Sequence, residues 1–141
     1  MIIKRILIVD DTRTWLFFHK EIIRQLYGET FEVTVCTSAA KAMSLINKNM
    51  SNPYNIIITD LQMENDYEPK TAGEWLVENI KRLNAYSSSS IIIISGMYNI
   101  EHIANTLNVE CIPKQRLVNN KLLIKYMFEK IMPHLKEIQF D

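Results

Sequence analysis

The sequence of 141 residues contains little cysteine and little histidine, and neither residue type is clustered. Cys36 and Cys111 form no close CxxC pair, and each falls within a predicted strand, so we expect two inert thiols. The three histidines, His19, His102 and His134, lack the spacing of metal ligands. The sequence therefore argues against a disulfide-rich scaffold and against a histidine-based metal site.

The chain also lacks a net charge, because 16 basic residues balance 16 acidic ones. Its overall field gives no reason to expect nucleic acid or an anionic membrane as a direct partner. No apolar run approaches the roughly 20 residues of a membrane helix, and residues 1–10 have the pattern of a strand rather than of a signal peptide. We expect a cytoplasmic protein whose length fits one domain.

Three short apolar runs rich in β-branched residues predict strands that are buried on both faces, as in a parallel sheet covered by helices. They occupy residues 6–9, 56–59 and 91–94. Apolar and polar residues alternate over residues 31–36, which predicts an edge strand, and residues 109–112 predict a last strand.

Apolar residues recur at helical spacing after each predicted strand. These helices begin near Arg13, Ala39, Ala72, Ile100 and Asn119. In the last one the apolar positions stay in phase through Leu135 and Ile138, so we expect it to continue past Pro133 with a kink. Five alternations of strand and helix predict a three-layer α/β fold with a parallel sheet and five helices.

Polar side chains follow four of the predicted strands. Asp10 and Asp11 follow the first, Asp60 the third, Ser95 the fourth and Lys114 the last. Taken alone, Asp60 is better explained as a turn residue than as a site residue. Because the carboxyl ends of parallel strands meet at one edge of the sheet, however, we expect all five side chains to lie together. Three crowded carboxylates repel one another unless a cation joins them, and an all-oxygen site suits Mg²⁺. With a lysine and a hydroxyl added, the site is suited to receive a phosphoryl group on Asp60.

With ILIVDD at 6–11, IIITDLQM at 56–63, IIISG at 92–96 and Lys114 after the last strand, the chain resembles the receiver domain of two-component response regulators. The resemblance covers nearly the whole chain and implies a flavodoxin-like strand order of 2-1-3-4-5. We expect a single receiver domain over residues 1–141 with no output domain. That order also places the two cysteines on opposite edges, about 19 Å apart, which excludes a disulfide between them.

The resemblance also implies roles for the residues at the strand ends. Asp60 is the phosphoacceptor, and Mg²⁺ is bound by Asp11, the Asp60 side chain and the Gln62 backbone carbonyl, with Asp10 acting through water on the metal. Lys114 pairs with the phosphoryl group.

In the same scheme, Ser95 swings toward the phosphoryl group as part of the switch. The sequence departs from the family pattern at the positions that transmit this movement. The switch aromatic of the last strand aligns with Cys111, and Tyr98 is the candidate substitute. The proline that usually follows the lysine is Gln115. Glu64 stands where a proline is usual, and the loop from there to Gly73 is longer and acidic.

We expect the output to be a protein contact. The expected phosphodonor is a sensor histidine kinase or a phosphotransfer protein, and a downstream protein reads the signal. Phe17, outside the first helix, and Leu122 and Tyr126, outside the last, are the candidate contact residues.

Three hypotheses for function follow. The first is a stand-alone response regulator that signals by a phosphorylation-dependent protein contact. Under this hypothesis the protein is not an enzyme, and it promotes only its own phosphotransfer and dephosphorylation. The second is an atypical receiver that binds its partner whether or not it is phosphorylated, as Cys111, Gln115 and the long loop indicate. The third is a phosphohydrolase with an aspartyl-phosphate intermediate, but such enzymes carry a second acid where this chain has Gln62.

Overall fold

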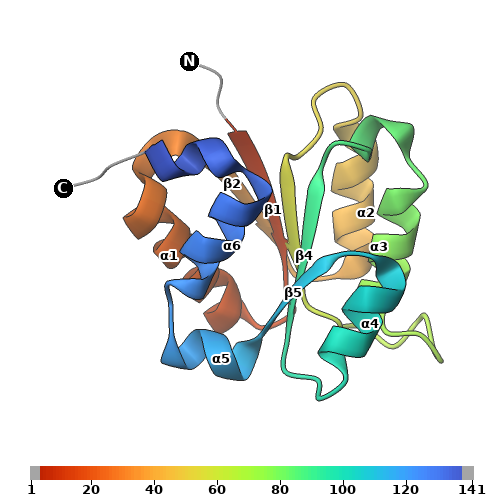
Figure 1. Cartoon of the computed structure of the whole chain (residues 1–141). Coiled ribbons are helices and arrows are strands. Elements are labelled where there is room, and N and C mark those ends of the chain that lie inside the picture. The colour runs from red at the N-terminus through yellow and green to blue at the C-terminus, as the bar shows by residue number, and fades with distance from the viewer. Residues whose placement is uncertain (1–3, 138–141) are drawn as a thin grey trace.

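A computed structural model describes residues 4–137 (Figure 1). Five parallel strands form one sheet in the order β2-β1-β3-β4-β5. Their bounds are β1 Lys4–Val9, β2 Phe31–Cys36, β3 Ile56–Thr59, β4 Ser90–Ser95 and β5 Glu110–Pro113. The predicted three-layer α/β class, the strand order and the position of residues 31–36 at an edge are confirmed.

Helices cover both faces of this sheet, as Figure 1 shows, with α1, α5 and α6 on one side and α2, α3 and α4 on the other. Their bounds are α1 Arg13–Tyr27, α2 Ala39–Lys48, α3 Ala72–Lys81, α4 Ile100–Leu107, α5 Lys114–Asn119 and α6 Leu123–Ile131. Short 3-10 turns are η1 Gly28–Thr30, η2 Asn84–Tyr86 and η3 Pro133–Glu137. None of the helices described over residues 4–137 is both long enough and apolar enough to cross a membrane.

The core has two halves, one on each face of the sheet. Successive side chains of a strand point to opposite faces, so neighbouring residues of one apolar run belong to different halves. In β3, Ile57 packs with α2, α3 and α4, whereas Ile56 and Ile58 pack with α1 and α6. Burial on both faces is the physical reason why β1, β3 and β4 are apolar at consecutive positions.

The C-terminal part of the chain differs from the prediction of one long helix. Residues 4–137 form six α-helices instead of the predicted five, because Lys114–Asn119 forms the unpredicted helix α5, and the last helix, α6, begins at Leu123 instead of near Asn119. Asn120 has an extended backbone that interrupts the helix, and its side-chain oxygen accepts a hydrogen bond from the Leu122 N–H at 3.2 Å. Asn120 therefore ends α5 and supports the turn that leads into α6, in agreement with the preference of asparagine for helix ends and turns.

The predicted continuation of this helix past Pro133 is wrong. The helix ends at Ile131, and Met132 leaves the helical conformation. Proline disfavours the helical conformation in the residue before it, which explains the end at this point. Leu135 is still buried, but within η3, and Ile138 lies outside the described residues.

The two cysteines are free thiols on the two edge strands, Cys36 on β2 and Cys111 on β5. Burial raises the pKa of Cys36 to about 11 and also raises the pKa of Cys111. Both side chains therefore remain protonated at neutral pH, and the sheet separates them as predicted.

Candidate functional site

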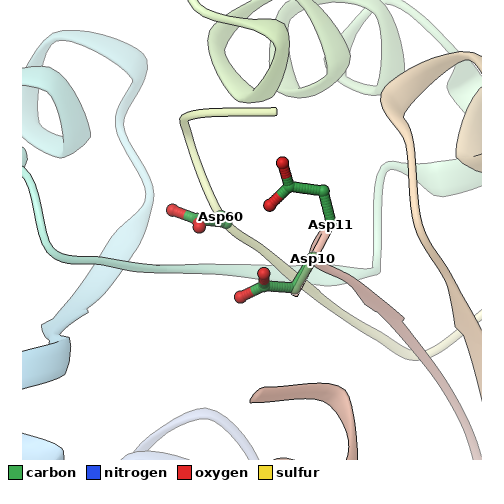
Figure 2. A group of neighbouring side chains, drawn as sticks. All are labelled: Asp10, Asp11 and Asp60. Carbon is green, nitrogen blue, oxygen red and sulfur yellow. The ribbon is translucent and has the colours of Figure 1, made fainter. Parts of the chain in front are cut away.

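Three carboxylates gather at the carboxyl ends of the two neighbouring strands β1 and β3 (Figure 2). Asp10 and Asp11 follow β1 directly, and Asp60 follows β3. One carboxylate oxygen from each lies within 4.8 Å of the others. Asp10 and Asp60 are buried and Asp11 is exposed, so the cluster is open to solvent through Asp11.

Backbone hydrogen bonds extend the sheet past the strand ends and fix both buried acids. The Asp10 N–H donates to the Cys36 carbonyl at 3.2 Å, and the Asp60 N–H donates to the Val9 carbonyl at 2.9 Å. Each acid also accepts one backbone hydrogen bond on its side chain. Asp10 Oδ1 accepts from the Thr12 N–H at 2.9 Å, and Asp60 Oδ1 accepts from the Leu61 N–H at 2.7 Å.

Lys114 lies between the two buried carboxylates. Its Nζ donates a hydrogen bond to Asp60 Oδ2 at 2.8 Å and lies 3.0 Å from Asp10 Oδ2. The lysine is the first residue of α5, directly after β5, so the last strand delivers its charge to the ends of β1 and β3. Asp10 Oδ2 accepts no well-oriented hydrogen bond from residues 4–137, although the lysine charge lies beside it.

The electrostatics of the cluster reflect this crowding. Burial raises the pKa of the Asp10 carboxyl, and the neighbouring Asp60 charge adds to the effect, while the Thr12 N–H and Lys114 oppose it. Burial tends to lower the pKa of Lys114, but its contacts with Asp60 and Asp10 outweigh burial and raise that pKa. Lys114 therefore stays a cation at neutral pH.

Ser95 and Gln62 both lie near the ends of their strands. Ser95, the last residue of β4, is buried, and its Oγ accepts a hydrogen bond from the Met97 N–H at 3.3 Å. Gln62 follows Asp60 by two residues and is exposed. The structure thus brings Asp10, Asp11, Asp60 and Lys114 into one cluster and leaves Ser95 engaged with its own loop.

The first turn of α3 packs directly on the backbone of Asp60. The Gly73 N–H donates to the Leu61 carbonyl at 2.9 Å. A Cβ at Gly73 would lie 2.1 Å from the Asp60 carbonyl oxygen and 2.6 Å from the Leu61 Cα. Only glycine permits this approach. The capping interaction at the start of α3 places Gly73 there, since Thr71 Oγ1 accepts a hydrogen bond from the Glu74 N–H at 3.2 Å.

The residues expected to transmit a signal make few contacts. Cys111 is half-buried on β5 and packs at the margin of the core half formed with α2, α3 and α4. Tyr98 is 96% exposed, so its ring does not fill the place of a switch aromatic beside Cys111. Among the contact candidates, Phe17, Leu122 and Tyr126 are all exposed, at 67%, 45% and 52%.

Two side chains near the cluster have contacts that the sequence did not reveal. Trp15 belongs to the apolar stripe of α1, yet its ring centroid lies 4.8 Å from Lys114 Nζ. Glu64, in the loop after β3, accepts hydrogen bonds from the N–H groups of Ala39 and Ala40 at 2.7 and 3.1 Å. Both contacts join residues that are far apart in the sequence, so neither has a local sequence signal.

Comparisons with known proteins agree with this arrangement. The family model described as response regulator receiver domain matches residues 6–115. A two-component response regulator from rice, Oryza sativa subsp. japonica, is 27% identical over 140 residues, which are 96% of this chain and 22% of the rice protein. The chain therefore spans about a fifth of the length of that relative.

Solved structures of receiver domains share the fold. A CheY-like response regulator receiver domain protein from Methanospirillum hungatei has a TM-score of 0.70 at 23% identity, over 97% of this chain and 100% of that one. The phosphorylated cyanobacterial phytochrome response regulator has a TM-score of 0.73 at 20% identity, over 91% and 93%. The isolated receiver domain of a Salmonella enterica regulator, solved with a beryllofluoride phosphate mimic, has a TM-score of 0.62 at 26% identity, over 81% and 79%.

Proposed function

Because the chain belongs to the response regulator receiver domain family, we propose that it accepts a phosphoryl group on Asp60 with the help of Mg²⁺ and signals through a protein contact that depends on phosphorylation. The observation that carries this proposal is the position of Lys114, whose Nζ lies within 3.0 Å of both Asp60 Oδ2 and Asp10 Oδ2. A cation held at the acceptor carboxylate is what an arriving phosphoryl group requires.

The donor set supports Mg²⁺ as the metal. All three acidic side chains offer oxygen, the ligand that Mg²⁺ prefers, and their oxygens lie within 4.8 Å of one another. Asp10 Oδ2 is buried and accepts no well-oriented hydrogen bond from the described residues, which leaves a lone pair for a cation. Asp10, Asp11 and Asp60 would hold the ion, together with the Gln62 carbonyl that the family resemblance implies. When bound, the ion neutralises negative charge on the phosphoryl oxygens.

The chemical step is a displacement at phosphorus. A new bond forms between phosphorus and a carboxylate oxygen of Asp60, while the bond from phosphorus to the donor breaks and the donor atom keeps its electron pair. Lys114 moves from the carboxylate to the phosphoryl oxygens and balances their charge. The buried backbone contacts of Asp60 hold the acceptor in place during the transfer.

The donor and the reader are both proteins in this proposal. A sensor histidine kinase or a phosphotransfer protein supplies the phosphoryl group. The proposed contact points are three exposed residues, Phe17 on α1, Leu122 directly before α6 and Tyr126 on α6.

The test is phosphorylation by a small donor. We expect the protein, incubated with Mg²⁺ and acetyl phosphate, to gain the mass of one phosphoryl group, and D60N to gain none. D66N, which removes an exposed acid from the neighbouring loop, is the matched control and should behave as the wild type. A mass gain that survives D60N, or no gain in the wild type, refutes phosphorylation on Asp60.

A second function is favoured by one observation: a cysteine, Cys111, stands on β5 where the family resemblance leads one to expect the switch aromatic, and the candidate substitute Tyr98 is 96% exposed. In this alternative the receiver binds its partner equally well in both states. Backbone amide NMR with Mg²⁺ and beryllofluoride distinguishes the two. Shifts that extend from the acid cluster to β5 and α4 support phosphorylation-dependent signalling, and shifts confined to the cluster support the alternative.

A further inference from the structure

The indole ring of Trp15 covers one side of the Lys114 ammonium group. Trp15 lies near the start of α1 and Lys114 at the start of α5, and the two meet only through the fold. The ring centroid lies 4.8 Å from Nζ, within the range of a cation–π contact. Asp60 Oδ2 and Asp10 Oδ2 lie 2.8 and 3.0 Å from the same ammonium, so three groups together constrain its position.

Neighbours on α1 hold the ring in place. Phe18 packs edge-on against it, with the centroids 5.1 Å apart, and the buried His19 lies 5.5 Å away. The Lys114 side chain is only 14% exposed, so water competes weakly for its charge. Cation–π contacts are strongest when the cation is desolvated and the ring is indole.

An indole ring differs from a further carboxylate in a way that matters for this site. It attracts the ammonium through the negative face of its π-system but carries no charge of its own. It therefore adds no repulsion to a cluster that already contains three acids, and it offers no oxygen that would compete for a metal ion or for phosphorus.

We propose that Trp15 is a positioning residue for phosphoryl transfer, whose ring face holds the Lys114 ammonium beside Asp60 and so raises the rate at which Asp60 is phosphorylated. The inference rests on the proposed function, because it concerns the rate of that transfer. Without the ring the ammonium samples more positions, and the fraction of molecules with the charge at the acceptor falls.

The first measurement needs no phosphorylation. Because Lys114 Nζ lies over the indole face, we expect the ring current to shift the protons on the adjacent Cε upfield, and the K114M variant identifies their NMR signal. We expect the signal to move downfield in W15L and less so in W15F. The matched control is W75L, the same tryptophan-to-leucine change at the half-buried Trp75 of α3, whose ring stacks on Tyr67 with the centroids 4.2 Å apart, and it should leave the signal unchanged.

The second measurement is the rate of phosphorylation by acetyl phosphate with Mg²⁺. We expect W15L to lower this rate by about threefold to tenfold and W15F by less, because a phenyl ring is a weaker cation–π partner. The control W75L should keep the wild-type rate. Fluorinated tryptophan, incorporated in a W75F background so that Trp15 is the only tryptophan, keeps the shape of the ring and withdraws its electrons. The rate should then fall further with each added fluorine.

The outcomes separate the inference from the proposed function. No transfer to the wild-type protein rejects the function itself. The role of Trp15 is rejected, and the proposed function is not, if the phosphorylation rate is unchanged in W15L. The same holds if the rate falls in W15L but does not fall with fluorination. A graded loss with fluorination, together with the displaced Lys114 signal, supports the inference even where W15L folds poorly.

Discussion

Replacing Glu64 by alanine should loosen the N-terminus of α2 and the loop after β3 together. The two carboxylate oxygens of Glu64 accept the N–H groups of Ala39 and Ala40, while the Ser38 hydroxyl accepts that of Lys41. The first N–H groups of a helix have no partner within the helix, so one loop residue satisfies two of them from a distant part of the chain. Glu64 therefore acts as a cap supplied across the fold.

The size of the effect follows from these contacts. Loss of a capping acceptor costs about 0.5–2 kcal/mol, and loss of a negative charge at a helix N-terminus about 0.3–1 kcal/mol. Because Glu64 is half-buried, we expect E64A to lower the free energy of unfolding by about 1.5 kcal/mol. E64Q, which keeps one acceptor oxygen, should lose about half as much.

Urea unfolding measures the loss, and amide hydrogen exchange locates it. In E64A the Ala39 and Ala40 amides should exchange faster, whereas the Lys41 amide keeps its hydrogen bond to Ser38. D66A removes an exposed acid from the same loop and is the matched control. If E64A and D66A unfold at the same urea concentration, or if the two alanine amides stay as protected as in the wild type, then Glu64 does not cap α2.

Three further predictions concern His19, Gly73 and the metal. Burial lowers the pKa of His19 to about 3, and the Lys114 charge adds to the effect. At mildly acidic pH the unfolded chain therefore binds a proton at His19 that the native protein does not bind. The free energy of unfolding consequently falls as the pH drops below about 6.5. Urea unfolding should show a loss of about 2 kcal/mol from this residue between pH 7 and pH 5, absent in H19Q; an equal loss in both proteins would contradict it. G73A should lower the unfolding free energy by about 1–3 kcal/mol, because its methyl group meets the Asp60 backbone, and a change below about 0.5 kcal/mol would show that the approach is not tight. Mg²⁺ at about 100 times its dissociation constant should raise the unfolding free energy by about 2.7 kcal/mol, and D11N should lose most of this gain at the same Mg²⁺ concentration.

Much of the fold was predictable because its strongest signals are local. Consecutive β-branched residues at 56–59 indicate a strand buried on both faces, and parallel strands deliver Asp10, Asp60 and Lys114 to one edge whatever the details of packing. The position of the acid cluster therefore followed from the strands alone. The predicted bounds of β3 agree with the structure, and those of β1 and β4 differ from it by one or two residues at an end.

The features that escaped prediction depend on contacts between distant segments or on steric rules that periodicity does not contain. Helix α5 has only six residues, too few to show an apolar repeat. The end of α6 is determined by Pro133 through the conformation of Met132, although the apolar residues beyond it stay in phase. Trp15 fits an ordinary core stripe, and its contact with Lys114 exists only once α1 and α5 pack together.

Gln115 offers a physical link between the acid cluster and the loop after β4. The resemblance to receiver domains leads one to expect proline here, which has no side-chain donor, but Gln115 Nε2 donates to the Gly96 carbonyl at 3.0 Å. Gly96 follows Ser95, whose strand position pairs with Pro113 next to Lys114. In the proposed phosphorylation of Asp60, a shift of Lys114 toward the phosphoryl group would therefore reach the Ser95 loop through Gln115, without an aromatic side chain at position 111.

For the proposed function, the free energy of the hydrogen bond between Gln115 and Gly96 favours a graded rather than an all-or-none response. An exposed hydrogen bond contributes about 0.5–1.5 kcal/mol, which corresponds to a shift of at most about tenfold in a two-state equilibrium. Moving a population from one state almost entirely to the other requires about 5.5 kcal/mol. Under the proposed function, the Gln115 contact alone would therefore only bias the surface of β5 and α4, and a partner that distinguishes the two states of Asp60 sharply would have to contact the acid cluster or its loops as well.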